Sequence, residues 1–288
     1  GDITQNAVLT VTGTSTFATD TASDILLTQA NDFTGAVGIT SGNNVSLVDA
    51  NSIELGASTV SGTYSVTATN GDITNSGDLG IALASTFITT VSGSNISLNS
   101  SGNAFANSVT LQAGAGAGTF GDITFVDSGA VVLDSSVAGD GDLFISAATA
   151  GVVGGSLNVT ATTGNISQAV AIGAGTTSSF TTLADDATIL LSTTTNALVG
   201  AVSLTTTDSA GNNSNATIDN GTTALNFGTV NVVGNLVAQS RDAITDTGII
   251  TVAGTASFAT NLVTNKAILL GSQNVITGAV TLLTSGTG

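Results

Sequence analysis

The sequence predicts an all-β fold, a single-stranded parallel β-helix (β-solenoid) with roughly three strands in each coil. Three observations lead to this prediction. A nine-residue pattern occurs four times, apolar triplets follow one another about every 8–12 residues, and the composition favours strands. Hydrophobic residues make up 41% of the chain and are mainly Ala, Val, Ile and Leu, diluted by Thr, Ser, Asn and 36 Gly.

The nine-residue pattern is an Asn followed by alternating apolar and small or hydroxylated residues. Such period-2 alternation is typical of a strand with one apolar face, entered through a turn. We expect the Asn residues to lie at equivalent corners of the coil and a Val six residues later to point into the core. The copies span 31–39, 103–111, 196–204 and 274–282, with Asn31, Asn103, Asn196 and Asn274 followed by Val37, Val109, Val202 and Val280.

A second marker lies upstream of each nonapeptide. It reads GDIT from Gly1 and Gly71, GNIS from Gly164 and DAIT from Asp242. The marker Ile is followed 14 residues later by a Phe in every copy, and this fixed spacing predicts that the ring is in the core. The pairs are Ile3 and Phe17, Ile73 and Phe87, Ile166 and Phe180, and Ile244 and Phe258.

These markers divide residues 1–288 into four homologous units, about 1–70, 71–163, 164–241 and 242–288. Short apolar strands also fill the segments between the copies, so we expect one continuous solenoid. A coil of such a solenoid typically takes about 20–25 residues, which predicts about 12–14 coils. The chain has no Met and no visible cap at either end, and we expect it to be part of a longer chain or to stack on another copy.

Charge and composition exclude several classes of function. The net charge is −17, with two Lys and Arg residues in all, so we expect no nucleic-acid partner. No apolar run approaches the ~18 residues of a membrane helix, so we expect no membrane insertion. There is no Cys, and redox compartment cannot be inferred from the sequence.

At this level the chain resembles a known class. The stretch from GDITQ through LTVTG to NDFTGAVGI, which its further copies extend over the whole chain, is similar to the filamentous haemagglutinin-type β-strand repeats of large bacterial surface proteins. This resemblance implies a right-handed parallel β-helix that is secreted, lies outside the cell or on the bacterial surface, and forms the shaft of an adhesin or filament. It also implies secretion by a two-partner route or as an autotransporter.

The residues that carry chemistry are scarce, and we expect no catalytic, cofactor-binding or metal site. The cations are Arg241 and Lys266, and the adjacent carboxylates of Asp185 and Asp186 would project to opposite faces of an extended strand. The segments 139–142 (GDGD) and 208–215 (DSAGNNSN) have calcium-type ligands but match no known calcium loop, so we interpret them as turns stabilised by Asp and Asn side chains.

The sequence therefore predicts a non-enzymatic extracellular structural β-solenoid, whose partners are further repeats or other copies stacked end to end. Two alternatives stay open. A glycan- or receptor-binding module would use loops between coils, for which Tyr64 and the segment 112–120 are the nearest candidates. A polysaccharide-degrading β-helix enzyme is the more remote alternative, because such catalysis needs paired carboxylates with a cationic partner.

Overall fold

The computed structural model describes residues 1–114, 120–134, 142–145, 152–209, 211 and 213–285. Contacts divide the chain into two compact units, residues 1–129 with 135–154, and residues 130–134 with 155–288. Each unit is an all-β parallel solenoid; the chain has about 11 turns, and its strands fall into three parallel sheets. The predicted fold class is confirmed.

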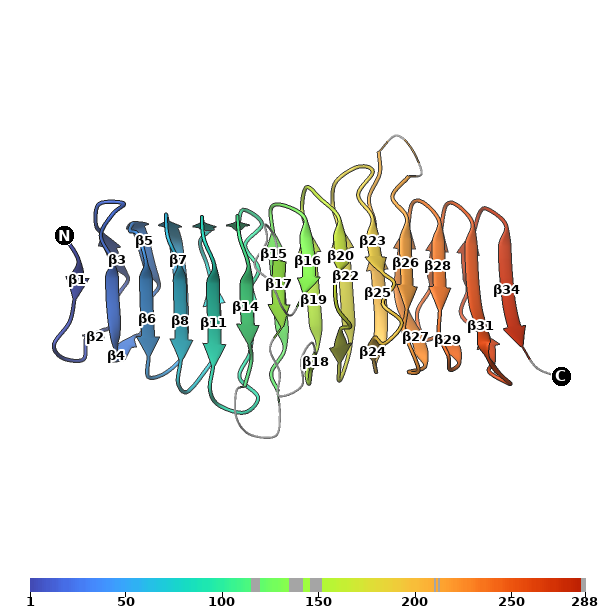
Figure 1. Ribbon diagram of the computed structural model, residues 1–288, viewed down its shortest axis with the longest axis horizontal. Coiled ribbons are helices and arrows are strands. Elements are labelled where there is room, and N and C mark those ends of the chain that lie inside the picture. Colours follow the sequence, from blue (N-terminus) through green and yellow to red (C-terminus); the bar gives the residue numbers. More distant parts are fainter. Residues whose placement is uncertain (115–119, 135–141, 146–151, 210, 212, 286–288) are drawn as a thin grey trace. The chain divides into compact units, whose positions relative to one another are not determined.

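In the first unit, successive coils add one strand at a time to a first sheet, and all described strand pairs are parallel (Figure 1). This sheet follows the order β1 (Ile3–Thr4), β4 (Ile25–Phe33), β6 (Val45–Asp49), β8 (Tyr64–Ala68), β11 (Ser85–Thr89), β14 (Val109–Gln112) and β17 (Asp142–Ile145). The other strands of the unit are β2 (Thr10–Val11), β3 (Ser15–Ala18), β5 (Val37–Ser41), β7 (Ile53–Val60), β9 (Ile73–Asn75), β10 (Leu79–Ile81), β12 (Ile96–Leu98), β13 (Ala104–Phe105), β15 (Ile123–Asp127) and β18 (Val152–Val153). Of these, β2 pairs with the end of β4, and β3, β5, β7, β9, β10, β12, β13 and β15 form a second sheet.

The second unit is built in the same way. Its first sheet follows the order β16 (Val131–Asp134), β20 (Ile166–Gln168), β23 (Ile189–Leu191), β26 (Ala216–Asp219), β28 (Leu236–Gln239), β31 (Ala256–Thr264) and β34 (Val280–Ser285). Its second sheet contains β19 (Leu157–Ala161), β22 (Ser178–Thr182), β25 (Ala201–Thr205), β27 (Leu225–Val232), β29 (Ile244–Asp246), β30 (Ile250–Val252), β32 (Ile268–Leu269) and β33 (Val275–Ile276). A third side carries β21 (Gly173–Ala174) paired with β24 (Ala197–Leu198).

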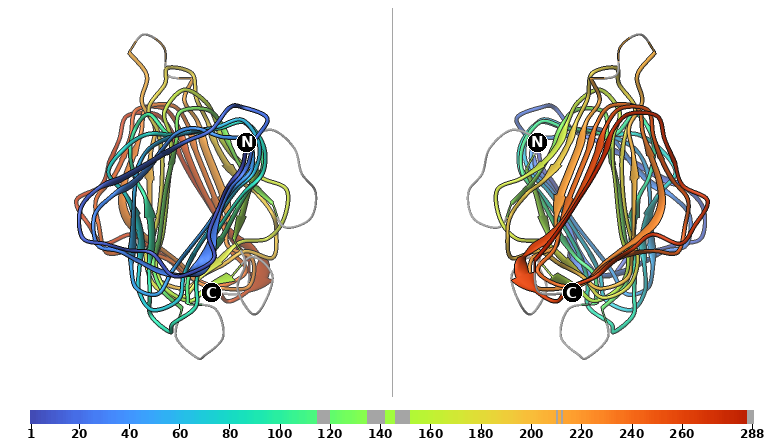
Figure 2. Two further views of the ribbon diagram at one scale, coloured as in Figure 1. Left: turned by 90° about the vertical axis from the view of Figure 1, so that its left-hand side faces the viewer. Right: turned by 90° about the vertical axis from the view of Figure 1, so that its right-hand side faces the viewer.

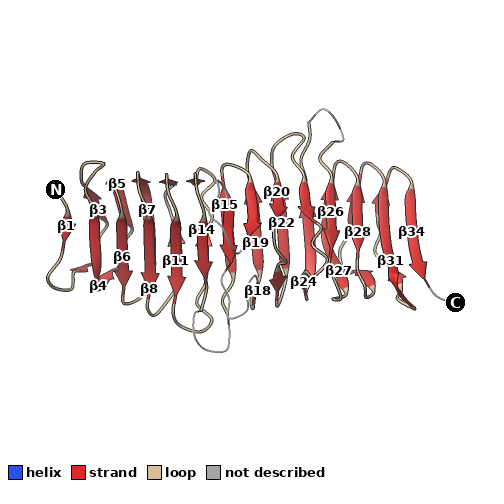
Figure 3. Cartoon of the chain, viewed as in Figure 1, coloured by secondary structure: helices blue, strands red, loops and turns tan. Residues whose placement is uncertain are grey.

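The strands form because alternate residues are apolar, so that each strand has one face to bury. Strand β8 buries Tyr64, Val66 and Ala68 and leaves Ser65 and Thr67 half-buried on the outside. Strand β8 pairs in parallel with β6 of the coil before it and with β11 of the coil after it. Figure 2 shows the coils end-on as closed turns of the chain, and Figure 3 shows the loops that join the strands.

The register gives the length of a coil directly. In the first unit, one column contains Ile3, Ile25, Val45, Tyr64, Ser85 and Val109, so the coils between these residues take 19 to 24 residues each. Longer steps occur in both units, 34 residues from Val109 to Leu143 in the first, and 27 from Ile189 to Ala216 and 35 from Val131 to Ile166 in the second. These steps explain why the expected 12–14 coils is wrong and the chain has about 11 turns.

The core contains most of the residues that the repeats predicted. Val37, Val109 and Val202 are buried, as are Phe87, Phe180 and Phe258, whereas Phe17 in the first coil is partly covered and packs edge-to-face on Phe33. The prediction is wrong for Val280, which is 49% exposed. Val280 pairs with the buried Ala256 and so continues an inward column, but no described coil covers it.

The four sequence copies do not occupy equivalent sides of the coil. Val37 and Val202 lie in the second sheets (β5, β25), whereas Val109 and Val280 lie in the first sheets (β14, β34) of their units. The reason is the repeat length: three coils lead from Ile3 to Tyr64 in one column, and the next marker Ile, Ile73, lies nine residues further, on the next side. The expectation of equivalent corners is therefore wrong.

Three homologous serines, each two residues before a marker Phe, point into the core. The hydroxyls of Ser15, Ser85 and Ser178 are buried and have no hydrogen-bond partner among the described residues, and the same holds for the Tyr64 hydroxyl beside Ser85. Burial raises the pKa of Tyr64 well above its ordinary value. An unpaired buried hydroxyl costs free energy, so these side chains weaken the core.

We predict that Ser85→Ala stabilises the fold by about 1 kcal/mol, because it removes an unpaired buried hydroxyl. The fourth copy already has Ala256 at this position. The measurement is the free energy of unfolding from a denaturant titration that is monitored by circular dichroism. Ser58→Ala is the matched control, because the Ser58 hydroxyl accepts from Ile39 N–H and donates to Gly56 O. Ser58→Ala should lower the free energy of unfolding. A decrease of the same size in Ser85→Ala would contradict the interpretation.

Candidate functional site

The Asn that opens each nonapeptide is an interior residue rather than a surface turn. Asn31, Asn103 and Asn196 are buried, and Asn274 in the last coil is half-buried. Asn31 lies within β4, and the others directly precede β13, β24 and β33. A buried amide must find partners for its carbonyl oxygen and its NH₂ group.

The Asn carbonyl oxygen satisfies a backbone N–H of the preceding coil. In all four copies this N–H belongs to the residue six positions after the marker Ile, just before or at the start of a short strand. The donors are Leu9 (2.9 Å), Leu79 (3.0 Å), Ile172 (2.9 Å) and Ile250 (2.8 Å). The two sequence markers are therefore joined by one hydrogen bond between neighbouring coils.

A second bond joins the Asn to the side chain two residues after the marker Ile. This side chain is Gln5, Asn75, Gln168 or Asp246 in the four copies. With Gln the pairing is reciprocal: Gln168 Nε2 donates to Asn196 Oδ1 at 2.8 Å, and Asn196 Nδ2 donates to Gln168 Oε1 at 2.9 Å. We call the nonapeptide Asn, its marker side chain and the bonded backbone N–H the coil clamp.

The clamp also reaches the following coil. The Asn NH₂ group donates to a carbonyl of that coil in three copies, at Val48, Val126 and Asp219. In that coil a buried side-chain oxygen accepts the N–H two residues after the Asn, and we count this acceptor as part of the clamp: Phe33 donates to Asp49, Phe105 to Asp127 and Leu198 to Asn220. Each of these three clamps thus connects three successive coils.

The acidic members of the clamp differ in their electrostatics. Burial raises the pKa of Asp49 and Asp127, against the lowering effect of backbone N–H donors. At Asp246 burial also acts to raise the pKa, but hydrogen bonds from Asn274, Gly271 and Ser272 outweigh it and lower the pKa. The charged carboxylate forms of Asp49 and Asp127 are therefore less favourable in the folded chain than in the unfolded chain.

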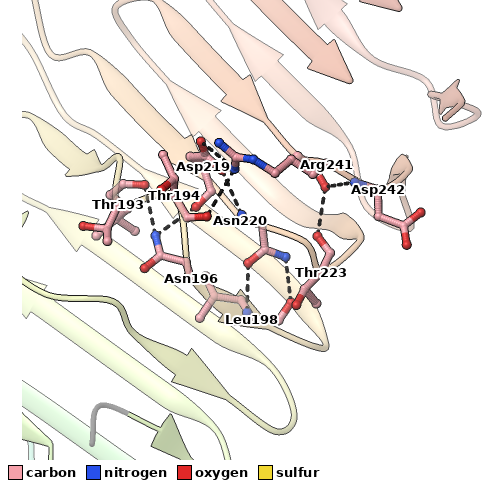
Figure 4. Close-up of polar contacts among 12 residues, drawn as sticks. Thr193, Thr194, Asn196, Leu198, Asp219, Asn220, Thr223, Arg241 and Asp242 are labelled. Atoms are coloured by element: carbon pink, nitrogen blue, oxygen red, sulfur yellow. Dashed lines mark hydrogen bonds and ion pairs between the residues drawn. The ribbon is translucent and has the colours of Figure 1, made fainter. Parts of the chain in front are cut away.

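Arg241 adds a cation to the clamp of the third copy (Figure 4). Its Nη1 lies 3.1 Å from Asp219 Oδ1 and also donates to the carbonyl of Thr194 at 3.2 Å, so that it links three coils. Asp219 is buried and also accepts the Gly221 N–H at 2.8 Å. Gly221 has a positive φ of 60°, and a side chain there would clash with Asn196 O.

The other cation is also used between coils. Lys266 Nζ lies 2.8 Å from Asp242 Oδ1, whose pKa is lowered by that hydrogen bond and by the N–H of Ala243. In the described part of the chain, neither Arg241 nor Lys266 faces the pair of carboxylates that a hydrolytic site would need.

The acidic segments weighed as calcium sites form hydrogen-bonded turns where they are described. Asp208 accepts the N–H groups of Gly211 and Asn213, and Asp185 accepts the N–H of Ser209. Asp185 and Asp186 lie in a turn, not in the extended strand considered from the sequence, and Asp186 has φ 60°. No three metal-ligating side chains gather among the described residues, and 139–141 with the side chain of Asp142 lie outside them.

Tyr64 does not serve a binding loop. It is fully buried in β8, where its ring packs edge-to-face on Phe87 at 5.8 Å, so its assignment as a loop aromatic is wrong. No described aromatic side chain is exposed, and residues 115–119 of the other candidate loop lie outside the description. No described helix is long and apolar enough to cross a membrane.

Sequence reasoning found the Asn but missed its partners. The signal was available: in every copy a Gln, Asn or Asp stands two residues after the marker Ile, 26 or 28 residues before the nonapeptide Asn. The buried acids Asp49 and Asp127 carry no comparable marker in the sequence.

We predict that Asn103→Ala destabilises the fold by at least ~2 kcal/mol, because Leu79 N–H and Val126 O lose a buried partner. The measurement is the free energy of unfolding from denaturant titration. Asn99→Ala is the control in the same coil, since Asn99 is exposed and its side chain makes no hydrogen bond with the described residues. A loss no larger than that of the control would refute the clamp.

We predict that the Tm of Asp49→Asn changes less with pH than that of the wild type. Because the folded pKa of Asp49 is raised above 3.8, its stabilising contribution is complete below that pH and is lost as pH rises through the raised value. The Asn amide stays neutral, so the variant lacks this pH-dependent contribution to stability. Calorimetric scans between pH 7 and pH 4 measure the slope, with the exposed Asp78→Asn as control. Equal slopes in wild type and Asp49→Asn would contradict the assignment.

The family comparison agrees with the repeat that the clamp defines. The chain matches the family model "Repeats of unknown function (DUF5649)" over residues 1–40, 42–112, 120–205 and 213–283, and each match ends one residue after a nonapeptide. No curated protein and no solved structure matches the chain. Because the matched segments cover most of its residues, the chain belongs to the DUF5649 repeat family, with a β-solenoid as its fold.

Proposed function

We propose that this β-solenoid is a non-enzymatic structural element, the shaft of an extracellular adhesin or filament on a bacterial surface. The observation that supports the proposal is that the polar side chains of the clamps join neighbouring coils. The buried Asn and Asp side chains and the half-buried Gln168 of the clamps, and both cations, hold one coil to the next. A chain built this way maintains its own length and shape.

The resemblance to filamentous haemagglutinin-type repeats supports the location. A surplus of acid with no Cys suits a secreted fibre that must stay soluble, and it disfavours nucleic-acid and anionic-membrane partners. The parallel stack also supports a mechanical role, because backbone hydrogen bonds run along the solenoid from coil to coil.

We also propose that coils of this kind continue by stacking, either within a longer polypeptide or on another copy. In the last coil Val280 and Leu282 are 49% and 57% exposed. They pair with Ala256 and Phe258, which are buried one coil earlier. A further coil would bury both side chains as the preceding coils bury theirs.

The alternatives receive less support. A glycan- or receptor-binding module would be favoured by an exposed aromatic loop, but Tyr64 is in the core. A polysaccharide-degrading enzyme would need a cation beside paired carboxylates, whereas Arg241 and Lys266 each contact one carboxylate between coils.

Two experiments on cells that produce the protein test this function. They are electron microscopy of the native material and antibody labelling of intact, unpermeabilised cells. We expect labelled fibres or rods at the cell surface, in which this segment forms part of a continuous shaft. Label confined to the cell interior, or short separate particles with capped ends, would contradict the proposal.

A further inference from the structure

The chain contains two Asn–Gly dipeptides, Asn70–Gly71 and Asn220–Gly221. In such a pair the backbone nitrogen of the Gly can attack the side-chain carbonyl carbon of the Asn, because no Cβ on the Gly hinders the approach. Whether this happens in a folded protein depends on whether both groups are free. The two dipeptides therefore offer a direct comparison within one chain.

Asn70 lies at an exposed corner between β8 and β9. Within the described part of the chain, neither its side chain nor the Gly71 N–H is held by a hydrogen bond. The fold nevertheless requires the Gly, since a Cβ at position 71 would lie 2.1 Å from Ser52 Oγ. Packing thus retains a reactive dipeptide at a site where its reacting groups are free.

In the second dipeptide, by contrast, hydrogen bonds hold both Asn220 and the Gly221 N–H. The Asn220 side chain is buried; Oδ1 accepts Leu198 N–H at 2.9 Å, and Nδ2 donates to the carbonyls of Leu198 and Ala224. The Gly221 N–H donates to Asp219 Oδ1 at 2.8 Å. Both reacting groups are therefore occupied, and attack would require the coil to open.

We propose that Asn70 is a site of spontaneous deamidation and isomerisation, and that Asn220 is protected by the clamp. The Gly71 nitrogen bonds to Asn70 Cγ and gives up its proton, the bond from Cγ to the side-chain amide nitrogen breaks, and this nitrogen takes up the proton and departs as ammonia. The product is a cyclic imide. Water then opens the imide to aspartate or isoaspartate. The product adds a carboxylate beside Asp72, which accepts Asn95 N–H from the next coil at 2.7 Å, and isoaspartate also lengthens the backbone at this corner.

The test incubates the folded chain at mildly alkaline pH and 37 °C for several weeks and follows both positions by peptide mass spectrometry that separates aspartate from isoaspartate. We expect conversion at Asn70 at least ~10-fold faster than at Asn220, because Asn220 reacts only from locally opened chains. Equal rates at the two positions in the folded chain would overturn the proposal.

Two controls make the result specific. In denaturant both dipeptides are free, so the two rates should become similar; an Asn70 that converts there but stays intact in the folded chain would also overturn the proposal. Asn70→Gln keeps an amide at this exposed corner but would have to close a larger ring. It should keep the circular dichroism spectrum of the wild type and abolish conversion at this position.

Discussion

The structure depends on hydrogen bonds to the backbone N–H and C=O groups that are buried at the corners of each coil. A strand two or three residues long has too few ladder hydrogen bonds to fix its own register, and a buried unpaired N–H costs free energy. The coil clamp resolves both problems, because one buried Asn accepts an N–H from the coil before it and donates to the coil after it. Register between neighbouring coils is thereby fixed by side chains as well as by the ladder.

This constraint explains the unusual composition. The core of a coil is too narrow for many large rings, so Val, Ile, Leu and a few Phe fill it. The corners need amides and carboxylates that reach one coil away, which accounts for abundant Asn and Asp. Cations are needed where a buried carboxylate is to be neutralised, as Arg241 does for Asp219, while Asp49 and Asp127 rely on backbone donors and have raised pKa values.

The sequence predicted the parts of the fold that depend on local pattern. Period-2 alternation identified the inward Val37, Val109 and Val202, and the fixed Ile–Phe spacing identified Phe87, Phe180 and Phe258 as core. It could not predict the side of the coil on which each copy lies, because the first repeat spans three coils and one further side, which places Ile73 on the next side. It also misplaced Tyr64, which is the first inward residue of the alternating strand β8.

The two sequence markers recur together because they are bonded across coils. A double-mutant cycle on Gln168 and Asn196 tests this explanation most directly, using Gln168→Ala, Asn196→Ala and the double variant. The reciprocal amide pair predicts a coupling free energy of at least ~1 kcal/mol, with the second substitution costing much less after the first. Additive losses, within about 0.5 kcal/mol, would show that the two residues stabilise the solenoid independently and would contradict this account.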